Sequence, residues 1–116
     1  MAPFVSYQQS IALIVELEKI LSRIKARDAD LAKQIKRAAS GVPLNLAEGR
    51  KRIGGDRLHL FRVAAGSVAE VAAGLDVAEL WGYIDRPIKA RQILDHLGAL
   101  TWGLTHKRND LPQDRE

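Results

Sequence analysis

The chain has 116 residues, 47% of them hydrophobic and 5% aromatic, and a formal net charge of +4 at pH 7. This length indicates a single domain, 1–116. The absence of cysteine excludes disulfides, thiol catalysis and zinc–thiolate sites, and it fits a reducing cytoplasm. No stretch approaches the roughly 20 apolar residues of a membrane span, and the first residues lack a signal-peptide pattern. We therefore expect a cytoplasmic protein that does not associate with membranes.

The positive charge is concentrated in one part of the chain. Residues 33–62 hold eight Lys and Arg against two acidic residues, a local balance of +6. The remainder holds ten basic and twelve acidic residues, a balance of −2. Such a segment can attract nucleic acid or another anionic surface. A solvated helix face with intramolecular ion pairs is the alternative interpretation.

Apolar residues recur at steps of three and four over four segments, which is typical of amphipathic helices. Short connections between them favour an all-α, antiparallel up-down-up-down four-helix bundle. The second helix is expected to be kinked at Pro43, because proline lacks an N–H but the apolar pattern resumes after it. The predicted helices cover 6–26, 30–49, 56–82 and 86–107, and a mobile polar tail is expected at 108–116. The predicted N-terminal signals are Ser6 with Gln9, Asp28 or Asp30, Asp56, and Asp85 with Pro87.

The same periodicity predicts which residues are buried in the bundle. The third helix has the most regular stripe, and it also carries many small residues that allow close packing. The predicted core residues are Ile11, Ile14, Leu17, Leu21 and Ile24; Leu31, Ile35, Ala38 and Val42; Phe61, Ala64, Val68, Val71, Leu75 and Ala78; and Ile93, Leu97, Leu100 and Leu104.

Three aromatic residues outside these stripes allow two interpretations, one of which is self-association of the chain. Trp81, Tyr83 and Trp102 lie outside the predicted core, and the first helix has a wider apolar face than one partner covers. Large exposed apolar patches are uncommon on monomers, so self-association is one interpretation. The other is that the tryptophans fill the ends of the bundle.

Polar residues of the second and third predicted helices can be matched in complementary pairs across the hairpin that the two helices form. If the chain turns near Ile53 and Gly54, antiparallel partners have residue numbers that sum to about 107. We therefore predict a polar seam that sets the helix register, with ligand or nucleic-acid contact as its alternative role. The predicted pairs are Arg37 with Glu70, Ser40 with Ser67, Asn45 with Arg62, and Glu48 with His59.

The connection between these helices is the best binding candidate in the sequence. Three consecutive cations stand next to two glycines, and this combination can follow a phosphate backbone. No aromatic residue stands beside them for base stacking, so we expect binding by charge and shape. The candidate nucleic-acid contacts are Arg50, Lys51, Arg52 and Arg57, supported by Lys33 and Lys36.

No catalytic, metal or cofactor site is predicted. His59, His96 and His106 show no metal-ligand spacing, and no phosphate-binding loop or nucleophile motif occurs. We expect a protein that is not an enzyme. The remaining enzymatic alternative uses Glu48 and His59, and it requires a pocket that encloses both.

Two segments resemble a known family. Residues 40–49, Ser-Gly-Val-Pro-Leu-Asn-Leu-Ala-Glu-Gly, are similar to the S-(I/V)-P-x-N-(I/L)-A-E-G signature of the 23S rRNA intervening-sequence proteins, with Gly41 as an additional residue after the serine. Residues 64–70, Ala-Ala-Gly-Ser-Val-Ala-Glu, resemble that family's A-x-G-S-x-x-E segment. The resemblance covers nearly the whole chain.

The resemblance implies a bacterial four-helix bundle with no established enzymatic activity. Related bundles act as accessory proteins of retroelements, where they form pentameric rings that bind nucleic acid and a reverse transcriptase. By this analogy we expect a homo-oligomer, a pentamer, that binds RNA or DNA through a basic patch. The alternative is a protein-interaction or scaffold module with no direct nucleic-acid role. Fold analogy alone does not decide between them.

Overall fold

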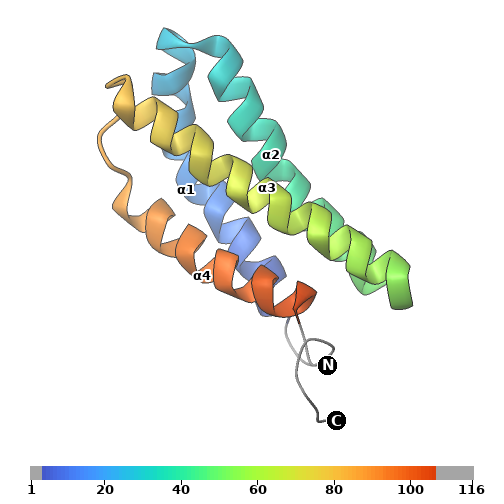
Figure 1. Ribbon diagram of the computed structural model, residues 1–116. Helices are drawn as coiled ribbons and strands as arrows, with labels where there is room; N and C mark the ends of the chain where they lie inside the picture. The colour runs from blue at the N-terminus through green and yellow to red at the C-terminus, as the bar shows by residue number, and fades with distance from the viewer. Residues whose placement is uncertain (1–3, 107–116) are drawn as a thin grey trace.

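The computed structural model describes residues 4–106 and consists of four helices with short connections (Figure 1). No boundary differs from the predicted one by more than two residues. The predicted tail, 108–116, lies outside the described residues. The helices are α1 (Val5–Arg27), α2 (Ala29–Arg50), α3 (Gly54–Leu80) and α4 (Ile88–Thr105).

Each helix packs mainly against two others. α1 contacts α2 and α4, and α3 contacts the same two helices, so α1 lies diagonally across the bundle from α3. Contacts between α2 and α3 define an antiparallel hairpin, since positions earlier in α2 meet positions later in α3. Gly49 lies against Phe61, Gly41 against Ser67, and Ile35 against Gly74.

The α2 and α3 core stripes match the prediction. All six residues expected in α3, and all four expected in α2, are buried. Their regular spacing places the apolar residues on a single face of each helix, and that face is the one that is buried.

The α1 and α4 stripes were predicted incorrectly in part. In α1 the buried residues are Ser6, Ser10, Leu13, Leu17, Ile20 and Ile24, whereas Ile11 is 41% exposed. In α4 they are Ala90, Leu94, Leu97, Thr101 and Thr105.

Hydroxyl residues explain this difference. Thr101 and Thr105 donate to the carbonyls of Leu97 and Thr101, at 2.9 and 3.0 Å, and Ser10 donates to Tyr7. A hydroxyl that bonds to its own helix can be buried at little cost. A pattern read only from apolar residues misses such positions and shifts the stripe toward the partly exposed leucines and isoleucines.

Three of the four predicted N-terminal signals were wrong. α4 begins after Pro87 and has no side-chain cap, so Asp85 does not cap it and Pro87 is not its first residue. α1 begins after Phe4, and Ser6 lies buried in its first turn instead of capping it. α3 begins after Ile53, so Asp56 lies in its first turn. The prediction for α2 is confirmed, because Oδ1 of Asp28 accepts a hydrogen bond from the N–H of Leu31 at 3.0 Å.

Pro43 lies inside α2, which continues through it from Ala29 to Arg50. The continuation agrees with the expectation that proline does not end this helix, and the kink itself stays a prediction. Within the described residues, no helix is both long and apolar enough to cross a membrane.

One charged cluster that sequence analysis missed joins α3 to α4. Nε of Arg91 donates to Oε2 of Glu79 at 3.0 Å, and the guanidinium also bonds to Asp76. Burial acts to lower the pKa of Arg91, but the two carboxylates more than offset it, so that the pKa is raised. Arg91 therefore keeps its positive charge where the two helices meet.

Candidate nucleic-acid interface

The basic connection between α2 and α3 lies at the end of the hairpin. In Figure 1 this end extends past the start of α1 and the end of α4. Residues 50–57 are all exposed. Gly54 has a φ of +60°, which glycine adopts without strain, and this lets the chain turn directly into α3. The fold therefore presents four cations and one carboxylate, Asp56, to solvent at a projecting tip.

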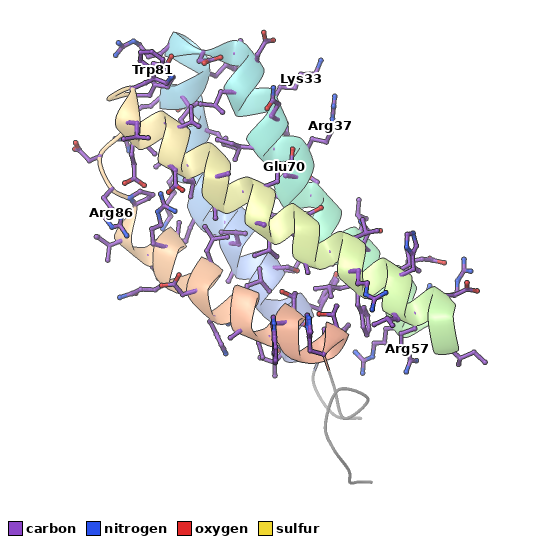
Figure 2. All side chains as sticks on the ribbon, in the orientation of Figure 1. Lys33, Arg37, Arg57, Glu70, Trp81 and Arg86 are labelled. Atoms are coloured by element: carbon purple, nitrogen blue, oxygen red, sulfur yellow. The ribbon has the colours of Figure 1, made fainter. Side chains whose placement is uncertain are left out.

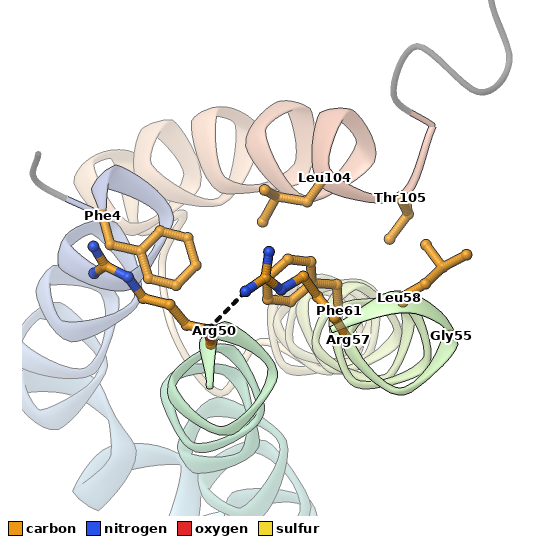
Figure 3. A pocket seen from close by; sticks show the side chains of 9 residues that line it. Phe4, Arg50, Gly55, Arg57, Leu58, Phe61, Leu104 and Thr105 are labelled. Carbon is orange, nitrogen blue, oxygen red and sulfur yellow. Dashed lines mark hydrogen bonds between the residues drawn. The ribbon is translucent and has the colours of Figure 1, made fainter. Parts of the chain in front are cut away.

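Arg57 has a structural role at this tip. Its Nε donates to the carbonyl of Gly49 at 3.2 Å, and its second terminal nitrogen donates to the carbonyl of Arg50 at 2.9 Å (Figure 3). The last carbonyls of a helix lack intrahelical partners, and a cation there also interacts favourably with the helix dipole. Arg57 therefore closes the end of α2 from the first turn of α3.

Arg50 and Arg52 also have partners within the chain. The guanidinium of Arg50 lies 4.8 Å from the centre of the Phe4 ring, a cation–π contact. Arg52 bonds to Glu48 through two nitrogens, at 2.6 and 2.9 Å, and both side chains remain about half exposed. An exposed pair of this kind contributes little to stability, so a phosphate can replace the carboxylate at low cost.

Lys51 differs from these arginines. Its side chain is exposed and makes no hydrogen bond or ion pair with any described residue. Lys51 and Arg52 are therefore the cations that can engage a ligand without disturbing the end of α2.

The supporting lysines lie elsewhere on α2. Lys33 and Lys36 line a groove between α1 and α2. At 1.5 Å per residue, Lys33 lies roughly 25 Å along α2 from Arg50. Figure 2 places Lys33 and Arg57 toward opposite ends of the molecule. The fold thus divides the six candidate residues into two separate groups.

The predicted polar seam does not form as hydrogen-bonded pairs. Glu48 bonds to Arg52, Asn45 donates to the carbonyl of Gly41 at 2.8 Å, and Ser40 donates to the carbonyl of Lys36 at 2.9 Å. None of the four cross-helix pairs is bonded among residues 4–106. Each of these three side chains finds a partner on its own helix or within one turn of it, which needs no match across the hairpin.

The register of the hairpin explains the remaining seam residues. Ser67 faces Gly41 instead of Ser40, and the close contacts sum to 108–110 instead of 107. His59 and Arg62 are exposed. Arg37 and Glu70 are also exposed, and no ion pair joins them among the described residues. These residues therefore lie on the solvent side of the hairpin.

A cavity of about 710 Å³ opens beside the basic tip (Figure 3). Its wall combines cations with aromatic and aliphatic residues. No aromatic residue stands beside the loop in the sequence, but the fold brings in Phe4 from the start of α1, with the centre of its ring 6.1 Å from that of Phe61. Neither Glu48 nor His59 lines this cavity, so it does not supply the pocket that the enzymatic alternative requires. The lining residues include Phe4, Arg50, Gly55, Arg57, Phe61 and Leu104.

Metal-ligating groups do not gather in the part of the chain that the structure describes. No three His, Asp or Glu side chains there are placed to hold an ion together. The arrangement at the tip therefore offers positive charge, glycine backbone and aromatic surface.

Comparison with known proteins establishes the family. Residues 4–102 match the family model of the 23S rRNA-intervening sequence protein, so the chain belongs to that family. No curated protein matches the chain. It is similar in fold to the crystal structure of a protein with unknown function from the S23 ribosomal protein family of Bacteroides thetaiotaomicron VPI-5482. That likeness has a TM-score of 0.77 at 15% identity, and covers 88% of this chain and 99% of the other.

Proposed function

We propose that this protein is a non-enzymatic, cytoplasmic homo-oligomer that binds RNA or DNA through phosphate contacts at the α2–α3 tip. The observation that carries the proposal is the exposure of Lys51 and Arg52 at the projecting end of the hairpin. Phosphate contacts of this kind bind without regard to sequence. Oligomerisation, with five copies, follows the family analogy.

The backbone at the tip supports a close approach of phosphate. A Cβ built at Gly54 or Gly55 would meet no neighbouring atom of the described chain within 4 Å, so this stretch is open. The start of α3 has no side-chain cap, which leaves its first N–H groups available to an anion. Asp56 opposes this attraction, but the four cations around it leave an excess of +3 between residues 50 and 57.

The test is a binding measurement with a structured RNA stem-loop and with duplex DNA, at low and at physiological salt. We expect the double variant Lys51→Glu/Arg52→Glu to weaken binding at least tenfold. It should also reduce the slope of log K against log salt by about 2, because each lost phosphate contact removes about one released counterion. Arg57 is left unchanged because it closes the end of α2, and Arg50 because it contacts Phe4.

The matched control is Lys33→Glu/Lys36→Glu, which changes the net charge equally at the distant groove. Affinity that falls equally in both double variants would mean that net charge matters and the tip does not. If the unmodified protein binds neither nucleic acid at low salt, the proposal is wrong.

The alternative is a protein-interaction or scaffold module, and exposed apolar residues favour it specifically. Leu80, Trp81 and Trp102 are 85%, 68% and 60% exposed. The tryptophans therefore do not fill the ends of the bundle, and exposed tryptophan is typical of protein interfaces. An unmodified protein that is an oligomer but binds neither nucleic acid at low salt would support this alternative.

A further inference from the structure

Helix α3 is apolar on its outer side as well as in the core. A helix at the surface of a monomer normally carries polar residues on its outer face. Between residues 63 and 80, α3 exposes two carboxylates, Glu70 and Asp76, among apolar or small residues. The exposed apolar and small positions are Val63, Gly66, Ala69, Ala73, Val77 and Leu80.

No contact within one chain explains why position 66, inside a helix, is a glycine. A glycine inside a helix costs about 1 kcal/mol relative to alanine. At Gly74 the bundle accounts for this cost, because a Cβ there would lie 2.6 Å from Cγ1 of Ile35. At Gly66 a Cβ would meet no neighbouring atom of the described chain within 4 Å. The small residues around Gly66 thus leave a shallow surface that a second helix can approach closely.

A complementary face lies on α1. Tyr7, Ile11 and Val15 are 37%, 41% and 53% exposed and stand four residues apart, so they form one outward stripe of large side chains. Because α1 lies diagonally across the bundle from α3, the stripe and the shallow surface face away from each other on one molecule. The α1 stripe of one chain therefore cannot cover the α3 surface of the same chain. The α1 stripe of a second copy can cover that α3 surface.

We infer that the outer face of α1 of one copy packs against the outer face of α3 of the next copy. This inference rests on the proposed homo-oligomer and names the surfaces that build it. α1 and α3 run in the same direction within the bundle (Figure 1), so copies in the same orientation present them as parallel helices. The facing pairs are Tyr7 with Gly66, Ile11 with Ala69, Val15 with Ala73, and Lys19 with Asp76.

Charge selects this register over its neighbours. Lys19 follows Val15 by one turn, and Asp76 follows Ala73 by nearly one turn, so the packing of large against small residues also brings opposite charges together. Lys19 pairs with Glu16 and Asp76 with Arg91 within one chain, but the side chains of Lys19 and Asp76 remain 59% and 61% exposed, so both can also reach a neighbouring copy. A shift of one turn would place Lys19 against Leu80, where its ion pair with Glu16 of the same helix would be its partner and no charge of the next copy would be added.

The contact joins two different faces, so it is heterologous and repeats from copy to copy. Such contacts generate a ring when the rotation between copies closes. A face-to-face dimer through α3 alone would leave the α1 stripe uncovered.

The first experiment measures molar mass by size-exclusion chromatography with light scattering. We expect Ile11→Glu and Ala73→Glu each to reduce the oligomer to single chains, because each buries a carboxylate in the contact. An equimolar mixture of the two variants should form dimers, since each retains the face that the other lacks. Leu44→Glu, at a residue 68% exposed on α2, is the control and should leave the mass unchanged.

The second experiment uses the absence of cysteine from the chain. Oxidation of Val15→Cys/Ala73→Cys should link neighbouring copies into a ladder of disulfide-bonded multimers. Leu44→Cys/Ala73→Cys should not. Circular dichroism checks that each variant remains helical.

The outcomes separate this inference from the proposed function. If the unmodified protein is a single chain in solution, the homo-oligomer and this contact are both wrong, whatever the nucleic-acid result. If the unmodified protein is an oligomer but Ile11→Glu and Ala73→Glu keep its full mass, the contact alone is overturned. Loss of mass in Ala73→Glu but not in Ile11→Glu would also overturn it, in favour of an α3–α3 contact.

Discussion

Two glycines of α3 show how the surroundings of a residue decide its contribution. Gly74 packs against Ile35, where added volume has no room, whereas Gly66 faces open space. Both belong to the small residues of the third helix that predict close packing, because nothing in the local sequence pattern separates them. Only the positions of the neighbouring helices do so.

This contrast predicts opposite effects of the same substitution. Gly74→Ala should lower the free energy of unfolding by about 1–3 kcal/mol, because Cγ1 of Ile35 lies near the root of its side chain and cannot move away cheaply. In the background of Ile11→Glu, where no second copy is expected to cover this face, Gly66→Ala should raise it by up to about 1 kcal/mol through helix propensity. Urea denaturation at one fixed protein concentration measures both. Equal changes in the free energy of unfolding for Gly74→Ala and Gly66→Ala would contradict the difference in packing.

The helices differ in how far the sequence predicted them. The bounds of all four were predicted to within two residues, and the core of α2 and α3 followed from periodicity. The stripes of α1 and α4 did not, because Ser6, Ser10, Thr101 and Thr105 occupy buried positions that an apolar pattern skips. The candidate site was predicted as one group of cations, but the length of α2 separates Lys33 from the tip. Phe4 reaches the tip through tertiary packing, which spacing in the sequence does not reveal.

The attachment of α4 to α3 also depends on contacts that the sequence does not indicate. Arg91 and Glu79 have side chains only 14% and 18% exposed, so the loss of one leaves the other poorly solvated. We expect Arg91→Met to lower the free energy of unfolding by about 1–3 kcal/mol. Lys89→Met is the control, because it removes a positive charge of α4 that is largely in solvent. The Lys89 side chain is 73% exposed, and its Nζ lies 3.8 Å from Oε2 of Glu16. A loss no greater than that of the control would argue against a stabilising role for the cluster.

At the scale of the whole molecule, the two ends of the bundle differ. One end carries the basic tip, and the other carries Leu80 and Trp81. In the proposed assembly all copies share one orientation, so every basic tip projects on the same side. The hairpin of α2 and α3 thus determines where the charge of the assembly gathers.

The projecting hairpin has a consequence for avidity. Several weak tips on one side act on one ligand at a high effective concentration, and the gain can be on the order of 10²–10⁴ once the ligand spans more than one tip. We expect a duplex of about 40 base pairs to bind more than tenfold tighter per site than one of about 8. In Ile11→Glu, whose copies are separate, that dependence on length should disappear. Equal dependence in both proteins would mean that each tip binds alone, and the assembly would then serve some purpose other than multivalent capture.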